Sequence, residues 1–259
     1  MSEQGHLIVE YPAPSVLLLR LNRPHRRNAL TAALVIDLAQ HLGGAAASAE
    51  IRVVVLTGDE KAFCAGADIR EMNERGIAAM LDTDRLSAWR SMEAYPKPMI
   101  AAVRGVAFGA GCELAMIADL IVAGQGARFA QPEVKIGGLA GDGGTQRLPR
   151  LVGRQQAAKM LLTGEPVSGA QAKAIGLVCE VVEDDKVEST AIELAETIAR
   201  NAPLSVAATK MLIRQSDETG LADGLRIERD LLLGLFQSAD RVEGMTAFAE
   251  KRPPKWQGK

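Results

Sequence analysis

Cysteine and histidine are scarce in this 259-residue sequence. The three cysteines, Cys64, Cys112 and Cys179, are odd in number and have no paired spacing, and the three histidines lie far from any cysteine cluster. This pattern excludes a disulfide framework and a cysteine/histidine zinc site. We therefore expect reduced thiols, a cytoplasmic setting and no metal.

Long runs of one kind of residue are also missing. The 30 basic and 32 acidic residues give a net charge of -2 and are spread along the chain, so no basic stripe is available to follow a phosphate backbone. No apolar run approaches the roughly 20 residues of a membrane span, and the N-terminus lacks a basic segment followed by an apolar one. We therefore expect neither a nucleic-acid nor a membrane partner.

Apolar residues are plentiful, at 47% of the sequence, and they alternate between strand and helix patterns as far as about residue 200. Beyond Asn201 and Pro203 the pattern is helical. We therefore expect an α/β core in residues 1–200, which carries the site, and an α-helical oligomerisation region in residues 201–259. The expected strands are a hairpin over 6–21, then 51–58, 98–105, 119–124 and 178–183, with a short strand or turn over 127–133. The expected helices are 31–42, 69–95, 109–119, 153–162, 168–176 and most of 184–259.

Two loops rich in glycine and alanine follow two of the expected buried strands. CAGAD follows the strand at 51–58, and FGAGCE follows the strand at 98–105. Small residues let a ligand approach the backbone, and a helix that starts at such a loop presents free N–H groups. Two such loops side by side predict an oxyanion hole, and therefore a substrate with a polarised carbonyl.

Two glutamates stand in apolar surroundings close to these loops. Glu113 is one turn into the helix after the second loop, and Glu133 follows 20 positions later, past that helix and a returning strand. The helix runs away from the end of the sheet and the strand returns to it, so both carboxylates lie at the same end. There their mutual repulsion favours one protonated acid and one ionised base. The plainer alternative is that each is a surface acid on the first turn of a helix.

Other chemistries have little support in the sequence. Cys112 has no neighbouring histidine, so we expect a small core residue and not a nucleophile. Asp68 has the position of a helix cap. The glycine pattern of dinucleotide-binding loops fails at Leu114, and no GxSxG motif occurs.

Motifs in a fixed order along nearly the whole chain are similar to those of the crotonase, or enoyl-CoA hydratase/isomerase, superfamily. They are LNRPHRRNAL, KAFCAGADIREM, KPMIAAVRGVAFGAGCELAM, FAQPEVKIG, GGTQRLPRLVG, LTGEPVSGAQAKAIGLV and EGMTAFAEKRPP. The resemblance implies a crotonase-like (ClpP/crotonase) α/β spiral of ββα units with an α-helical C-terminal region, assembled as a homotrimer or a dimer of trimers.

The resemblance also implies roles for individual residues. The backbone N–H groups of Ala67 and Ala110 would hold the thioester oxygen of an acyl-CoA substrate. Glu113 and Glu133 would bind a water between them, with Glu113 as base and Glu133 transferring the proton at C2, and the backbone of Gly141 would help to place that water. The pair favours reversible syn hydration of a trans-2-enoyl-CoA to a 3-hydroxyacyl-CoA, which needs no metal or redox cofactor.

Six residues are expected to bind the coenzyme A portion of the substrate: Arg27, Ala29, Ala65, Asp68, Ile69 and Lys255. Arg26 and Lys251 carry further charges that match regions approaching coenzyme A in the family. For each of these cations, a solvated surface charge is an equally good interpretation.

The chain departs from the family pattern after Glu133. Hydratases of this kind often carry GxxPGxGGTQRL, whereas here Ala140 replaces the proline and Asp142 adds a third acid. This departure keeps open double-bond isomerisation or another acyl-CoA lyase or dehydratase reaction of the same superfamily. An alternative of another class is a non-catalytic relative that binds RNA or a partner protein.

Overall fold

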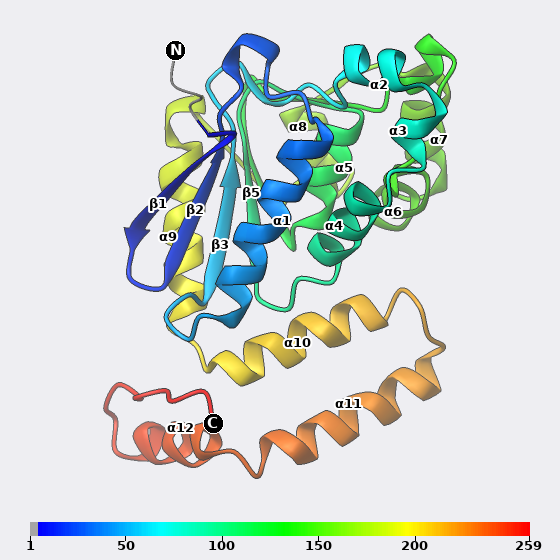
Figure 1. Cartoon of the computed structure of the whole chain (residues 1–259). Coiled ribbons are helices and arrows are strands. Elements are labelled where there is room, and N and C mark those ends of the chain that lie inside the picture. Colours follow the sequence, from blue (N-terminus) through cyan, green and yellow to red (C-terminus); the bar gives the residue numbers. More distant parts are fainter. Residues whose placement is uncertain (1–4) are drawn as a thin grey trace.

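Two β-sheets of unequal size carry the first part of the chain in a computed structural model that describes residues 5–259 (Figure 1). The larger sheet has the strand order β1-β2-β3-β5-β7-β10, and the smaller has the order β4-β6-β8-β9. The strands are β1 Leu7–Ala13, β2 Val16–Leu21, β3 Val53–Thr57, β4 Ala62–Cys64, β5 Met99–Val103, β6 Val106–Phe108, β7 Leu120–Gly124, β8 Arg128–Ala130, β9 Val167–Ser168 and β10 Glu180–Val182.

From β3 to β8, consecutive strands alternate between the two sheets. β3, β5 and β7 pair in parallel in the larger sheet, and the strand after each of them, β4, β6 or β8, joins the smaller one. β3 and β5 are buried at all five positions, as expected for central parallel strands that are covered on both faces. The repeated strand, strand and helix unit winds the chain into a spiral whose turns stack on one another.

Helices cover both faces of the larger sheet. On β3, Val54 and Leu56 face a core shared with α1, whereas Val53 and Val55 face a second core shared with α9. This alternation is the two-residue period of a strand. The helices are α1 Ala32–Ala47, α2 Ile69–Arg75, α3 Ile77–Met80, α4 Thr83–Glu93, α5 Ala110–Ile117, α6 Gly144–Val152, α7 Arg154–Thr163, α8 Gly169–Ala174, α9 Val187–Ala199, α10 Pro203–Gln215, α11 Leu221–Leu235 and α12 Ala239–Ala249.

Most expected elements are confirmed, and the errors have local causes. The hairpin, the four further strands and the helix capped by Ser168 are present, the last with a complete capping box. The single helix expected over 69–95 is wrong: Gly76 has a positive φ of 54° and separates α2 from α3, and Asp82 caps the start of α4. The sequence does not predict β4, β6, β9 or α6, because two- or three-residue strands show no periodicity and Pro149 lies inside α6.

The last three helices form a layer beneath the sheets in Figure 1. α11 has no buried residue, although it carries Leu225, Leu232 and Leu233. The division into domains at residue 200 stays a prediction, and residues 1–4 of the first range lie outside the described part. Among residues 5–259, no helix combines the length and apolar character needed to cross a bilayer.

An ion pair between the buried side chain of Lys210 and the half-buried side chain of Asp119 attaches α10 to the sheet. The Lys210 side chain is 6% exposed, and its Nζ donates to Asp119 Oδ2 at 2.7 Å and to the Lys97 carbonyl at 2.6 Å. Asp119 Oδ2 also accepts the Met99 N–H at the start of β5. Burial lowers the pKa of Lys210 to about 8, so the ammonium depends on Asp119 to stay charged.

Asp119→Ala is expected to lower the free energy of unfolding by about 3 kcal/mol, because it leaves the Lys210 ammonium buried without a counter-charge. Lys210→Met is the matched control, since it removes the charge at similar length and leaves Asp119 bonded to Met99; we expect a loss of less than about 1.5 kcal/mol. Urea unfolding at one protein concentration measures both. An Asp119→Ala value equal to wild type would contradict this account.

Candidate active site

The two loops expected to form an oxyanion hole lie against each other. β4 and β6 are parallel neighbours, so both loops begin at the same edge of the smaller sheet. Contact at this edge is tight: a Cβ added to Gly111 would lie 2.2 Å from the Cys64 carbonyl oxygen. Gly66 has a φ of +113°, and a Cβ there would lie 3.0 Å from the Phe108 carbonyl oxygen. Only glycine lets the loops approach this closely.

The backbone N–H groups of Ala67 and Ala110 are both available at this contact. The parallel bridge between Leu30 and Ala67 uses the Gly66 carbonyl and the Asp68 N–H, so the Ala67 N–H points away from the bridge. Ala110 is the first residue of α5, where an N–H has no acceptor within the helix. The two alanines expected to hold an oxyanion therefore present donors from adjoining loops.

Glu113 lies one turn into α5 and is 1% exposed. Its Oε1 accepts two backbone N–H groups, from Asp142 at 2.8 Å and from Gly144 at 2.7 Å. Burial raises the pKa of Glu113 to about 7; the N–H of Gly144 opposes this shift, and the charges of Asp142 and Glu133 add to it. A carboxyl group with a pKa near neutrality can both accept and return a proton.

Glu133 opens the short helix η2 (Glu133–Ile136) directly after β8. Its carboxylate lies against the start of α5, since a Cβ on Gly109 would be 2.8 Å from Glu133 Oε1. Burial raises the pKa of Glu133, and the charge of Asp142 raises it further. Helix α5 and the returning strands β7 and β8 thus bring the two glutamates together at one edge, as their spacing indicates.

Gln131 lies in the site, although no sequence motif described above includes it as a functional residue. It is 1% exposed, and its amide lies beside Gly144 and Glu113, with Nε2 2.9 Å from the position of a Cβ on Gly144. Within residues 5–259, neither polar atom of the Gln131 amide nor Glu133 Oε2 has a hydrogen-bond partner. Its position directly after the strand RFA, as a polar residue, is the sequence feature that could have indicated a place in the site. These atoms can bind water or substrate.

Five of the residues expected to bind coenzyme A lie on one rim of the site. Ala65 donates its N–H to the Arg27 carbonyl, and Asp68 caps α2 while forming an ion pair with Arg23. Ala29 lies two residues after Arg27, and Ile69, at the start of α2, is exposed. The helix-cap interpretation of Asp68 is confirmed.

Lys255 lies apart from these five residues. Its N–H donates to Glu243 on α12, and the neighbouring Trp256 indole donates to the Arg200 carbonyl at the end of α9. In the part of the chain that the structure describes, no hydrogen bond or ion pair joins Lys255 to the other five. Its role toward coenzyme A stays a prediction.

Cys112 is a core residue, as expected. It is fully buried beside Glu113, and burial raises the pKa of its thiol. Gly141 is exposed and directly precedes Asp142, whose N–H donates to Glu113 Oε1; the role of Gly141 in placing a water stays a prediction. Across residues 5–259, no three His, Cys, Asp or Glu side chains gather in a way that could hold a metal ion.

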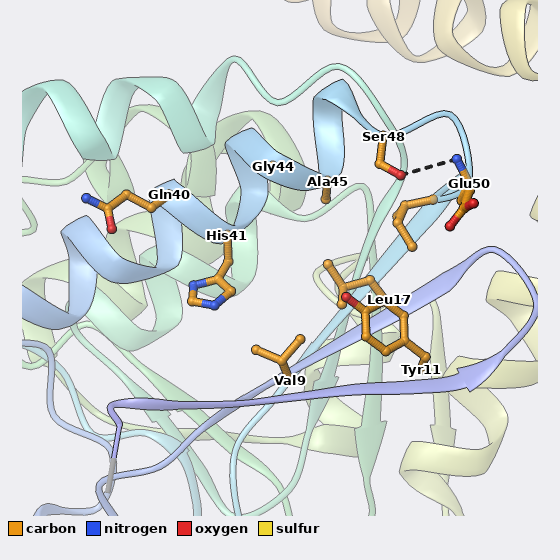
Figure 2. A pocket seen from close by; sticks show the side chains of 10 residues that line it. Val9, Tyr11, Leu17, Gln40, His41, Gly44, Ala45, Ser48 and Glu50 are labelled. Atoms are coloured by element: carbon orange, nitrogen blue, oxygen red, sulfur yellow. Dashed lines mark hydrogen bonds between the residues drawn. The ribbon is translucent and has the colours of Figure 1, made fainter. Parts of the chain in front are cut away.

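A hollow of about 460 Å³ lies elsewhere, between β1 and α1 (Figure 2). Val9 and Tyr11 line one side, and His41, Gly44 and Ser48 line the other. It contains none of the site residues described above. We therefore place the chemistry at the edge of the smaller sheet and not in this hollow.

Known proteins resemble the chain over nearly its whole length. The family model described as enoyl-CoA hydratase/isomerase matches residues 13–259. A 2,3-dehydroadipyl-CoA hydratase from Escherichia coli is 47% identical, over 94% of this chain and 96% of its own length. A mitochondrial enoyl-CoA hydratase from Pongo abelii is 44% identical, over 92% and 82%. The solved structure of an enoyl-CoA hydratase from Bacillus anthracis has a TM-score of 0.93 at 38% identity, covering 98% of this chain and all of its own.

The raised pKa of Glu113 predicts a pH-dependent loss of stability. Between about pH 4.5 and pH 7 the folded protein keeps a proton that the unfolded chain releases, so the free energy of unfolding falls as pH rises, by up to about 3 kcal/mol from this group. Glu113→Gln should remove that part of the decline. Urea unfolding at pH 5 and pH 8 tests this, with Glu193→Gln on the exposed face of α9 as a control. Equal declines in wild type and Glu113→Gln would contradict it.

Proposed function

Because the chain belongs to the enoyl-CoA hydratase/isomerase family, we propose that its site adds water to a trans-2-enoyl-CoA and gives a 3-hydroxyacyl-CoA. The protein is an enzyme, a hydro-lyase that acts on an enoyl-CoA, and its fold is the predicted crotonase-like one. One observation supports the assignment of roles: the buried carboxylate of Glu113 and the half-buried carboxylate of Glu133 adjoin two loops that present backbone N–H groups.

The N–H groups of Ala67 and Ala110 would bind the thioester oxygen. Attack of water at C3 of a conjugated thioester moves negative charge onto that oxygen. Two preorganised donors stabilise this charge, and each donor is worth roughly 3 kcal/mol or more. Glycine at positions 66 and 111 lets the two loops pack closely, so that the two N–H groups lie near each other.

The glutamate pair would supply and remove the protons. Glu113 takes a proton from water as the water oxygen bonds to C3, and Glu133 gives a proton to C2, so that one O–H bond breaks and one C–H bond forms. The two N–H groups on Glu113 Oε1 fix that carboxylate, whereas the Glu133 Oε2 atom has no hydrogen-bond partner among residues 5–259. Both carboxylates come from one edge of the sheet, which supports syn addition.

The same arrangement favours hydration over the alternatives. Moving a double bond needs one group that takes and returns a proton, whereas both carboxylates are present and adjoining here. Hydration involves no net oxidation or reduction, and the two N–H donors stabilise the charge on the thioester oxygen, so the proposed reaction calls for neither a redox cofactor nor a metal. RNA binding as the main activity gains no support from the near-neutral balance of charge.

We propose further that three chains assemble, either as a trimer or as a dimer of trimers. The support is α11, which buries no residue in the single chain while Leu225, Leu232 and Leu233 are 42% to 53% exposed. An apolar helix of this kind is typical of a subunit interface. The cytoplasmic location stays a prediction, and one of the relatives is named as mitochondrial.

Glu113→Gln and Glu133→Gln are each expected to lower kcat for hydration of crotonyl-CoA by about 10²-fold to 10⁴-fold, because each removes a proton-transferring group. Loss of the enoyl absorbance measures the rate, and product mass separates hydration, which adds one water, from isomerisation, which leaves the mass unchanged. Glu193→Gln on α9 should retain wild-type turnover. Wild-type turnover by Glu113→Gln would refute the role of this residue.

Light scattering after size-exclusion chromatography should give a mass of three or six times the 27.5 kDa chain. Leu232→Glu combined with Leu233→Glu should lower that mass, because charges would then occupy the apolar face of α11. Glu228→Gln on the same helix is the control. A monomeric wild-type protein would contradict the proposed assembly.

A further inference from the structure

Asp142 is the acid that the family resemblance does not predict, and the structure gives it two separate links. Its backbone N–H donates to Glu113 Oε1 at 2.8 Å, so it helps to hold one glutamate of the pair. Its side chain points to α4, where it accepts hydrogen bonds from Arg85 Nη1 at 3.0 Å and Nη2 at 2.5 Å. One residue therefore joins the glutamate pair to a cation on another element.

The ion pair between Arg85 and Asp142 is largely shielded from solvent. The two side chains are 13% and 14% exposed, and the guanidinium also lies 5.6 Å from the ring centre of Trp89. A two-point arginine–carboxylate contact with this little exposure is geometrically specific, and water screens its charges weakly.

The backbone carbonyl of Asp142 also accepts hydrogen bonds from side chains of α4 and α6. The Trp89 indole N–H and Arg147 Nη1 both donate to the Asp142 carbonyl, at 3.1 Å and 3.0 Å. Arg147 is paired in turn with Glu93 on α4. Since these bonds fix the backbone independently of the Asp142 side chain, the carboxylate of Asp142 is not needed to keep its N–H on Glu113.

We propose that the ion pair between Arg85 and Asp142 is a charge-balancing device for the glutamate pair, in which Arg85 cancels the negative charge that Asp142 brings to the site. This inference rests on the proposed hydratase function. Arg85 and Asp142 are positioning residues here, since they act through Glu113 and Glu133.

The balance matters because the site already contains two carboxylates. The charge of Asp142 raises the pKa of both Glu113 and Glu133, beyond the effect of burial. Asp142, from the loop before α6, and Cys112, from α5, act on the pair directly; Arg85 and Glu93 from α4 and Arg147 from α6 surround Asp142. Arg85 is the cation that contacts the Asp142 carboxylate directly. Without it, the repulsion from Asp142 would act on the glutamates in full.

The two partners should therefore have opposite effects on the pH profile of kcat/KM, which reports the ionisation of the free enzyme. Asp142→Asn removes a negative charge and still offers an oxygen to Arg85, so the limbs of the profile should move to lower pH by about half a unit or more. Arg85→Met leaves the Asp142 charge uncompensated, and the limbs should move to higher pH. Arg85→Lys keeps the charge but loses the two-point contact, and should keep a profile close to that of wild type.

Crotonyl-CoA hydration from pH 5 to pH 10 supplies the readout, and circular dichroism of each variant shows whether it is folded. If wild type does not hydrate crotonyl-CoA, the proposed function fails before the variants are compared. If wild type is active, unshifted limbs in Asp142→Asn would overturn the inference. A shift of Asp142→Asn and Arg85→Met in the same direction would overturn it too. Reduced activity with an unchanged pH profile would mean that the pair only supports the loop.

Discussion

The site depends on one close approach, that of α5 to the end of β4. Gly111 lies so near the Cys64 carbonyl that no side chain fits between them. This contact puts the Ala110 N–H beside the loop that carries Ala67, and it sets the direction in which α5 leaves the smaller sheet. One turn further along α5, Glu113 is fixed by the same geometry. A single backbone contact thus positions both the donors for an oxyanion and one of the two carboxylates.

The apolar surroundings of Glu113 are part of its chemistry. In water a glutamate is ionised at neutral pH, whereas here burial brings the pKa to about 7, and two N–H groups keep the carboxylate from being driven still further toward its neutral form. Protons can then move in either direction at low cost. The folded protein bears a cost in stability for a poorly solvated acid, a common property of functional sites.

Local sequence predicts much of this arrangement, because the oxyanion loops and the glutamates are each marked by a short sequence pattern. Buried strands that end in glycine-rich loops, and glutamates at the following helix starts, are visible in residues 51–68 and 98–133. The break at Gly76 and the three-residue strand β4 were harder, since each depends on contacts with distant segments. The partner of Asp142 could not be predicted at all: Arg85 lies 57 residues away on a helix whose packing no local pattern specifies.

That long-range pair changes how the third acid of the site should be understood. Considered in the sequence alone, Asp142 is a charge that disturbs the glutamate pair. In the structure it is half of a nearly buried ion pair whose other half lies on α4, so the ionisation of the site depends on the packing of a helix that contributes neither of the glutamates nor the oxyanion donors. Any change that moves α4 relative to the loop before α6 also changes the field at Glu113 and Glu133. Packing and acid–base chemistry are therefore coupled through the guanidinium of Arg85.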